Sequence, residues 1–386
     1  MRKIDRLEEL ELWLDSAEED DAPPIAVQDL DLRRLGPRIM ARRWRGCLFL
    51  GCELELEQGG YIVADGGVVV PDLEGMLFPA HRSSLYTAEE LFAGFDADDP
   101  AAFERTWDYR VYRQYLEHGK DRPTSIRVSL ARRLHDHSIT DAVMDLIEGR
   151  RVVAIMGGHG MERSDSFYVR VARIARQLTR DGVLMLSGGG PGAMEATHLG
   201  AWLATYPDGA LDEALEILTP RPPGAAPGTE YADADWLHRA MRVIEAFPLD
   251  DERRRRSMSL GIPTWLYGHE PPAPFATHIA KYFANSVRED GLLALALDGV
   301  VFAPGSAGTT QEIFQDATQN HYGTPGFLSP MILFGVDHWT RVRPVWPLLE
   351  AVARDRRYGQ LLALTDHEDE ILERLTSYRR EEWVAD

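Results

Sequence analysis

The sequence of 386 residues contains only two cysteines, Cys47 and Cys52. Two thiols cannot form the disulfide framework of a small secreted domain, and their spacing does not match a common zinc-binding pattern. No segment approaches the ~20 uncharged apolar residues that a membrane-spanning helix needs. The amino terminus has no apolar run after its basic start, so it does not resemble a secretory signal. We therefore expect a cytoplasmic protein without membrane attachment.

The sequence also lacks an excess of positive charge. Its formal net charge is -20, with 42 Lys and Arg against 62 Asp and Glu. Such a surface repels phosphate backbones, which argues against general binding of nucleic acid. A small phosphorylated ligand is still compatible with this charge, because backbone N–H groups at helix ends bind anions locally. The apolar share of 44% predicts a large buried core rather than disorder.

Motifs of several metal-dependent and cofactor-dependent chemistries are missing as well. The histidines are scattered, and none lies in an HExxH-like context, so we expect no metal site. The chain has no Walker A lysine, no dinucleotide-type G-x-G-x-x-G register and no lysine in the context of a pyridoxal phosphate Schiff base. We expect no cofactor.

The first 148 residues differ in pattern from the rest. Helical spacing at 7–14 predicts a short amphipathic helix, and the acidic stretch 18–21 indicates a solvated linker. Short apolar runs predict strands of an irregular small sheet, and we recognise no internal repeat. Residues 87–148 have helical spacing. We interpret residues 1–148 as an α+β accessory domain. Its expected strands are 25–27, 47–50, 61–63 and 68–70.

From residue 150 onward, strands alternate with helices. This alternation predicts an α/β fold with a Rossmann-like, doubly wound parallel sheet over residues 149–386. The polar and proline-rich residues 205–260 form an insertion in it. The expected strands are 152–156, 183–186, 262–267, 299–303 and 331–334. The expected helices are 167–178, 193–204, 275–288 (amphipathic), 309–321, 341–353 and 367–378.

Three of these strands end in glycine-rich loops, at 157–160, 188–192 and 304–310. Glycine lets the backbone approach an anion, and the helix that follows directs its free N–H groups to the same place. Because ligands of an open parallel sheet bind beyond the carboxyl ends of its strands, the three loops together predict a phosphate cradle. For any single loop, a tight turn without a ligand is the alternative.

Two of the loops resemble a known family. Ser187-Gly-Gly-Gly-Pro-Gly-Ala-Met-Glu195 is similar to the G-G-G-x-x-G-x-M element of the LOG family, whose members were once named lysine decarboxylases. Pro304-Gly-Ser-Ala-Gly-Thr-Thr-Gln-Glu312 is similar to its P-G-G-x-G-T-x-x-E element. The resemblance covers residues 150–335 and extends to bacterial nucleotide 5′-monophosphate nucleosidases, which also have an extra N-terminal domain. It implies a Rossmann-like fold.

The resemblance also implies a reaction, which is hydrolysis of the N-glycosidic bond of a nucleoside 5′-monophosphate to free base and ribose 5-phosphate. Glu312 and Arg288 match the family's catalytic pair. A carboxylate near C1′ stabilises the oxocarbenium-like transition state. A homodimer or higher homo-oligomer is implied too. The residues implied to bind the AMP-like ligand are Gly157, Gly158, Ser187, Gly189, Gly190, Gly192, Met194, Gly305, Ser306, Gly308, Thr309 and Thr310.

Alternatives exist for both catalytic candidates. Thr309-x-x-Glu312 is also the pattern of a helix capping box, and Arg288 could be a solvated arginine near the C-terminus of the expected helix, on the face of Lys281 and Asn285. The sequence departs from the family at Ser306, at Arg288-Glu289 in place of Arg-Lys, and at the insertion 205–260. A non-catalytic nucleotide-binding or sensing protein on the same scaffold is therefore the alternative function.

Overall fold

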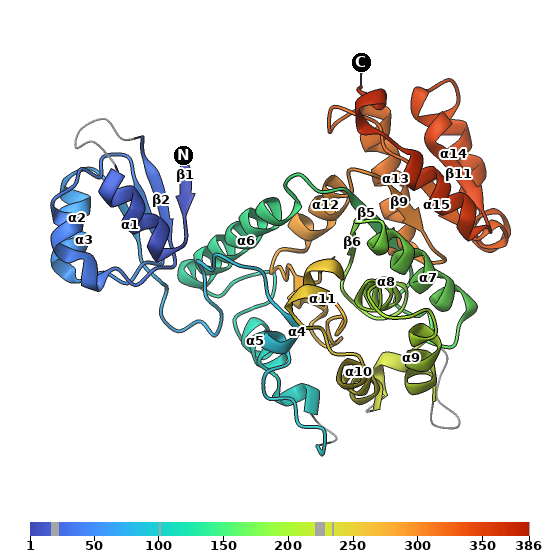
Figure 1. The fold of residues 1–386 in the computed structure, drawn as a ribbon, viewed down its shortest axis with the longest axis horizontal. Coiled ribbons are helices and arrows are strands. Elements are labelled where there is room, and N and C mark those ends of the chain that lie inside the picture. The colour runs from blue at the N-terminus through green and yellow to red at the C-terminus, as the bar shows by residue number, and fades with distance from the viewer. Residues whose placement is uncertain (17–22, 100–101, 221–227, 234, 386) are drawn as a thin grey trace. The chain divides into compact units, whose positions relative to one another are not determined.

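The computed structural model describes residues 1–16, 23–99, 102–220, 228–233 and 235–385. The chain divides into two compact units (Figure 1). The first comprises Met1–Leu85 and Gln114–Asp145, and the second comprises Tyr86–Arg113 and Leu146–Asp386. Residues 86–113, which the sequence analysis assigned to the N-terminal region, thus pack within the second unit. The acidic stretch 18–21 lies outside the described residues.

The first unit contains a four-stranded, fully parallel sheet in the order β1-β2-β3-β4. The expected irregular sheet is therefore wrong. The strand expected at 61–63 is wrong too, because those residues lie in α3, where a capping box of Glu55 and Gln58 starts the helix. The elements are β1 (Arg2–Ile4), α1 (Leu7–Ser16), β2 (Ile25–Gln28), α2 (Gly36–Met40), β3 (Leu48–Leu50), α3 (Leu56–Ala64) and β4 (Val68–Val70).

The small sheet contains a repeat that the sequence analysis did not recognise. Arg2 pairs with Ile25, Ala26 with Leu48 and Leu48 with Val68, which are offsets of 25 − 2 = 23, 48 − 26 = 22 and 68 − 48 = 20 residues. Each of these intervals contains one strand and one α-helix, so the successive strand-helix units lie side by side in the order of the chain. The strands have only three or four residues each, which is too short for the repeat to stand out in the sequence.

The second unit is built on a seven-stranded parallel sheet in the order β11-β10-β9-β5-β6-β7-β8. The chain runs outward from β5 to β8, returns to β9 beside β5, and runs outward again to β11. This confirms the Rossmann-like, doubly wound sheet. The strands are β5 (Val152–Met156), β6 (Leu184–Ser187), β7 (Ser259–Gly261), β8 (His278–Ile279), β9 (Val300–Phe302), β10 (Met331–Phe334) and β11 (Leu362–Thr365).

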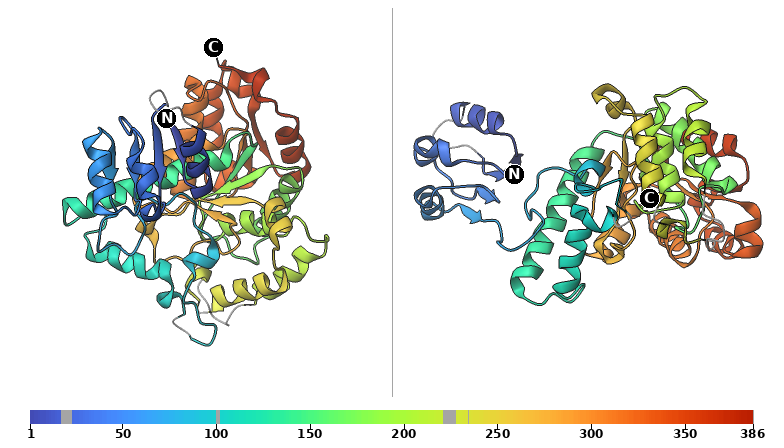
Figure 2. Two further views of the ribbon diagram at one scale, coloured as in Figure 1. Left: turned by 60° about the vertical axis from the view of Figure 1, so that its left-hand side comes forward. Right: turned by 90° about the horizontal axis from the view of Figure 1, so that it is seen from below.

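Helices cover this sheet (Figure 2). Helices α7, α8 and α15 pack in series, with α7 touching both others, and α13 likewise packs with α12 and α14. Gly200 allows the close crossing of α7 and α8, because a Cβ there would lie 2.2 Å from the carbonyl oxygen of Ala172. These helices are α7 (Ser166–Arg180), α8 (Ala193–Trp202), α12 (Asn285–Leu295), α13 (Ala307–Tyr322), α14 (Trp346–Ala353) and α15 (Glu368–Ser377).

The described helices of the insertion 205–260 belong partly to the core. The insertion forms α9 (Ala210–Leu218), α10 (Asp235–Ala246) and α11 (Asp251–Arg256), and both α9 and α10 add buried apolar side chains to the main hydrophobic cluster. The remaining helices are α4 (Ala88–Leu91), α5 (Trp107–Glu117) and α6 (Ile126–Ile147). None of the described helices is long and apolar enough to cross a membrane.

Two predicted elements between β6 and β9 are wrong. The strand expected at 262–267 is instead a short 3-10 turn at Trp265–Tyr267, and β7 precedes it. The helix expected at 275–288 is instead strand β8 followed by a loop, and α12 starts only at Asn285. Tyr86 from the distant segment 86–113 forms an antiparallel bridge with Ile279, so this edge of the sheet is covered. Most side chains of residues 275–283 are buried. Their apolar residues therefore follow a spacing that had suggested an amphipathic helix.

A fully buried ion pair joins three helices to the loop after β5. Arg163 bonds Glu195 twice, with Nη2–Oε1 at 2.5 Å and Nε–Oε2 at 3.0 Å, and the two side chains are 1% and 0% exposed. The hydroxyl of Tyr168 in α7 donates to Glu195 Oε2 in α8, and Arg163 Nη1 donates to the carbonyl of Trp236 in α10. The loop that starts at the glycines after β5 is thereby anchored to the helices behind the sheet.

We predict that Glu195→Gln lowers the free energy of unfolding by about 3–5 kcal/mol, because the neutral amide removes the carboxylate charge that is paired with the buried Arg163 guanidinium. Urea denaturation followed by circular dichroism measures this loss. The matched control is Asp337→Asn, which breaks the exposed pair with Arg341 and should cost no more than about 1 kcal/mol. Equal losses in the two variants would contradict the importance of the buried pair.

Candidate functional site

The three glycine-rich loops meet at one edge of the large sheet, as the sequence predicts. They follow β5, β6 and β9, which are neighbours in the order β9-β5-β6. The N–H of Gly158 donates to the carbonyl of Pro304 at 3.0 Å, and the N–H of Ala193 donates to the carbonyl of Gly158 at 3.2 Å. The winding reverses between β5 and β9, and this is the place where doubly wound sheets bind ligands.

Close packing explains most of the loop glycines. Gly192 has a φ of +72°, and a Cβ there would lie 2.4 Å from the carbonyl oxygen of Gly158. A Cβ on Gly157 would lie 2.6 Å from that of Ala193, and one on Gly305 would lie 2.1 Å from Thr309 Oγ1. Gly308 is different, because a Cβ there would meet nothing within 4 Å. The loops therefore need glycine where they touch one another.

Arg288 lies in the first turn of α12 and not near a helix C-terminus, so the expected placement is wrong. The helix dipole disfavours a cation at this end. Its side chain is held instead by a hydrogen bond from Nε to the carbonyl of Ile262 at 2.9 Å. Nη2 rests over Gly188, where a Cβ would lie only 2.3 Å away. The guanidinium is thus fixed against the second glycine loop.

Glu312 lies in α13, facing Arg288. The distance between Glu312 Oε1 and Arg288 Nη1 is 4.0 Å, and the two side chains are 19% and 14% exposed. Helix α13 starts at Ala307, with Ser306 as its N-cap and no side-chain cap bond. Thr309 is therefore already inside the first turn, so the capping-box interpretation of Glu312 is wrong.

The environment of Glu312 shifts its titration toward neutrality. Burial raises the pKa of this carboxyl to about 7, the positive charge of Arg288 opposes the rise, and Glu289 adds to it. A carboxyl with such a pKa exchanges a proton in the neutral range, which is the property required of a general acid or base.

A small cavity of about 60 Å³ opens beside Arg288. Met194 lines it together with two residues that the sequence analysis missed as site residues, Glu270 and Lys281. Burial raises the pKa of Glu270, while the charges of His159 and His269 oppose the rise. Glu270 therefore adds a second carboxyl with a perturbed pKa to the site.

Lys281 is fixed by a second buried ion pair. Its Nζ lies 2.6 Å from Oδ1 and 2.8 Å from Oδ2 of Asp108. Trp265 Nε1 donates to the same carboxylate at 3.0 Å. Because Asp108 precedes Lys281 by 173 residues, no local motif could have connected them. The expected helical face shared by Lys281, Asn285 and Arg288 is accordingly wrong.

The hydroxyl groups of the loops bond mainly to the protein itself. Ser187 is fully buried, and its Oγ donates to the carbonyl of Ile155 at 2.7 Å. Thr309 is buried against Gly305, and Thr310 Oγ1 donates to the carbonyl of Ser306 at 3.0 Å. Any direct contact of these loops with a phosphate would therefore come chiefly from backbone N–H groups.

Two further basic side chains surround the third glycine loop. His338 Nε2 lies 3.0 Å from the carbonyl oxygen of Gly305, and Arg343 Nε donates to the same oxygen at 3.2 Å. Burial lowers the pKa of His338. Both residues follow β10, and no sequence signal connected that region with the loop at 304–310.

No cluster of three or more His, Cys, Asp or Glu side chains suited to a metal ion occurs in the described part of the chain. Cys47 and Cys52 are both buried free thiols.

Comparisons with known proteins show a distant structural likeness. No protein-family model matches the chain, and no curated protein matches it. Among solved structures, the molybdenum cofactor binding protein from the phototrophic bacterium Rippkaea orientalis is similar, with 12% identity and a TM-score of 0.38. The match covers 60% of this chain and 98% of that chain. The fold assignment rests on the strand order described above.

We predict opposite effects from alanine at two loop glycines. Gly192→Ala should lower the free energy of unfolding by about 1–3 kcal/mol, because the positive φ is strained for alanine and its Cβ meets backbone oxygen. Gly308→Ala, in open space inside α13, should raise it by about 0.5–1 kcal/mol. Chemical denaturation of the two variants measures both effects. A loss at Gly308, or none at Gly192, would contradict the described loop contacts.

Proposed function

We propose that this protein hydrolyses the N-glycosidic bond of a nucleoside 5′-monophosphate, giving free base and ribose 5-phosphate. The observation that carries the proposal is the Arg288–Glu312 pair, whose nearest atoms are 4.0 Å apart beside glycine loops at the switch point of the sheet. The resemblance of the loops at 187–195 and 304–312 to the LOG family supports it, since these two residues match that family's catalytic pair.

The glycine loops are the proposed site of the 5′-phosphate. Backbone N–H groups of Gly157 and Ser306, with the N-terminal end of α13, provide donors for its oxygens. The N–H groups of Gly158 and Gly305 already bond to Pro304 and His338, so these two glycines shape the loops around the phosphate. Gly189 and Gly190 line the cavity together with Met194, and Gly192 follows them at the start of α8. Arg343, beside Gly305, adds positive charge near the same place.

In the proposed reaction, a water oxygen bonds to C1′ as the bond from C1′ to the base nitrogen breaks. The electron pair of the broken bond goes to the base, and positive charge grows on the sugar in between. An ionised Glu312 stabilises that charge and orients or deprotonates the water. Arg288 stabilises negative charge on the departing base or on the phosphate. No cofactor is required for this chemistry.

A non-catalytic nucleotide-binding protein is the second candidate. Two observations favour it: Glu289 follows Arg288 where the family has lysine, and the cavity of about 60 Å³ is small. Sites that enclose a whole small molecule usually measure ~300–1,000 Å³. A nucleotide would therefore lie across the open edge of the loops, with only a part of it in the cavity.

Homo-oligomer formation and a cytoplasmic location remain proposals taken from the resemblance and the composition. The amphipathic helix expected at 275–288 is replaced by β8, a loop and the start of α12, so it provides no apolar helix face for a subunit contact. Light scattering at micromolar concentration tests for an oligomer, and a monomeric mass would contradict it.

We predict that Glu312→Gln lowers base release by ~100-fold, a loss of roughly 3 kcal/mol in transition-state stabilisation, because the neutral amide cannot stabilise the oxocarbenium ion. Incubation with a panel of nucleoside monophosphates, followed by chromatography of free base, measures this. The wild-type kcat/KM should rise with pH through about 7, where Glu312 loses its proton. The variant should lack that inflection.

The matched control is Glu350→Gln on α14, an exposed carboxylate, which should leave base release unchanged. Calorimetric titration with the preferred nucleotide should show that Glu312→Gln still binds it. If the wild type binds nucleotides but releases no base, the non-catalytic alternative replaces the enzyme. If Glu312→Gln keeps full activity and the same pH profile, the assigned role of Glu312 is wrong.

A further inference from the structure

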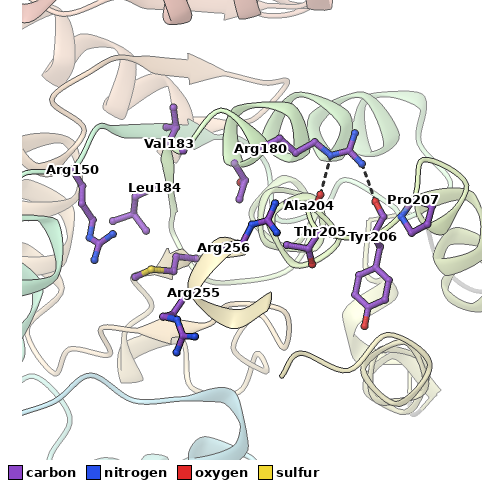
Figure 3. A pocket seen from close by; sticks show the side chains of 13 residues that line it. Arg150, Arg180, Val183, Leu184, Ala204, Thr205, Tyr206, Pro207, Arg255 and Arg256 are labelled. Atoms are coloured by element: carbon purple, nitrogen blue, oxygen red, sulfur yellow. Dashed lines mark hydrogen bonds between the residues drawn. The ribbon is translucent and has the colours of Figure 1, made fainter. Parts of the chain in front are cut away.

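A second pocket lies at the opposite edge of the large sheet from the glycine loops. It measures about 700 Å³ and is formed entirely by residues of the second unit (Figure 3). Arg150 precedes β5, Leu184 begins β6, and Met258 immediately precedes β7, so the pocket adjoins the amino ends of three neighbouring strands. Its volume lies in the range of sites that hold a small molecule.

The lining of this pocket is strongly basic. It includes four arginines from three places in the chain: Arg150 before β5, Arg180 at the end of α7, and Arg255 and Arg256 in α11 (Figure 3). No carboxylate is among the described residues that line it. This concentration of like charge contrasts with the net charge of -20 on the whole chain. Positive charges that are held together in a concave site attract anions.

Two of the four guanidinium groups, those of Arg150 and Arg255, form no ion pair with the described residues. Arg150 Nε donates to the carbonyl of Leu146 at 2.7 Å, which leaves its two terminal nitrogens. The nearest carboxylate to Arg256 is that of Glu252, at 3.9 Å on the exposed surface. An anion in the pocket would therefore meet guanidinium donors that the protein itself leaves available.

The other side of the pocket is more rigid. Arg180 donates to the carbonyls of Ala204 and Tyr206, both at 2.9 Å (Figure 3). It also pairs with the exposed Asp208 at 2.8 Å. Thr205 stands between Ala204 and Tyr206 in the chain. Its Oγ1 is buried and has no hydrogen-bond partner in the described part of the chain. A buried hydroxyl without a partner is costly unless a ligand or water satisfies it.

We propose that this arginine pocket binds a small anion that carries two or more phosphate groups. Arginine presents its N–H donors as a planar fork that matches phosphate oxygens. One phosphate group would occupy only part of the pocket and meet only some of the four arginines. A chain of phosphates would contact several of the guanidinium groups of Arg150, Arg255 and Arg256 at once.

The arginine pocket is separate from the proposed nucleotide site. Strand β6 connects the two, with Leu184 in the pocket at its start and Ser187 before the glycine loop at its end. A ligand of the arginine pocket therefore does not compete for the glycine loops. The two proposals can fail independently of each other.

Isothermal titration calorimetry of the full chain with inorganic tripolyphosphate tests this proposal. We expect tripolyphosphate to bind at least ~10-fold more tightly than orthophosphate, because it engages several guanidinium groups at once. The double variant Arg255→Ala/Arg256→Ala should bind it at least ~10-fold more weakly. The matched control is Arg341→Ala/Arg374→Ala, which removes two exposed arginines elsewhere and should leave the affinity unchanged.

Three results would overturn the proposal. These are equal affinity for orthophosphate and tripolyphosphate, unchanged affinity in the Arg255→Ala/Arg256→Ala variant, or tighter binding of a short single-stranded oligonucleotide than of tripolyphosphate. The last would indicate a nucleic-acid surface instead. Glu312→Gln should keep the tripolyphosphate affinity of the wild type. Binding of tripolyphosphate by a chain that releases no base would support this proposal while removing the proposed hydrolase activity.

Discussion

The buried ion pair of Arg163 and Glu195 is the interaction on which the architecture around the glycine loops depends. Glu195 stands in the same sequence element as the second glycine loop, and Arg163 follows the first. Two opposite charges at 1% and 0% exposure are tolerable only because each is bonded several times, to Tyr168 and Trp236 as well as to each other. The pair therefore requires α7, α8 and α10 to be in place at once. It holds two of the three loops in a fixed relation before any ligand arrives.

Around this fixed frame, the candidate site combines features that oppose stability. Arg288 occupies the helix end that its charge disfavours. Glu312 is buried to the point that its pKa rises to about 7, and Lys281 is buried completely against Asp108. Each of these arrangements costs free energy unless the surroundings enforce it, and such arrangements concentrate at functional sites. The closely packed glycine loops hold these side chains in place, because none of the contacting loops can move without displacing another.

The parts of the fold that the sequence predicted share a physical property. Strands β5, β6, β9 and β10 lie inside the sheet, so both of their faces are buried and their residues form continuous apolar runs. The prediction failed where burial came from distant chain. Around β8, Tyr86 covers Ile279, and Asp108 neutralises Lys281. The sequence of that edge therefore has neither the alternating polar and apolar residues of an exposed strand nor the polar composition of a loop. Glu270, His338 and Arg343 were missed for the same reason, since only the folded chain brings them to the glycine loops.

The two edges of the large sheet differ in how they can hold negative charge. In the nucleotide site proposed at the carboxyl edge, the donors are backbone N–H groups of glycine loops, which are neutral and suit a single phosphate in one orientation. In the arginine pocket proposed at the amino edge, the donors are charged guanidinium groups around a wider space. Charged donors attract anions over a longer range but fix their orientation less well. A strand of four residues separates the two, so a ligand at the amino edge contacts the end of the same strand whose other end carries Ser187. The sheet itself is thus the shortest physical connection between them, and its tightly packed interior transmits displacement rather than absorbing it.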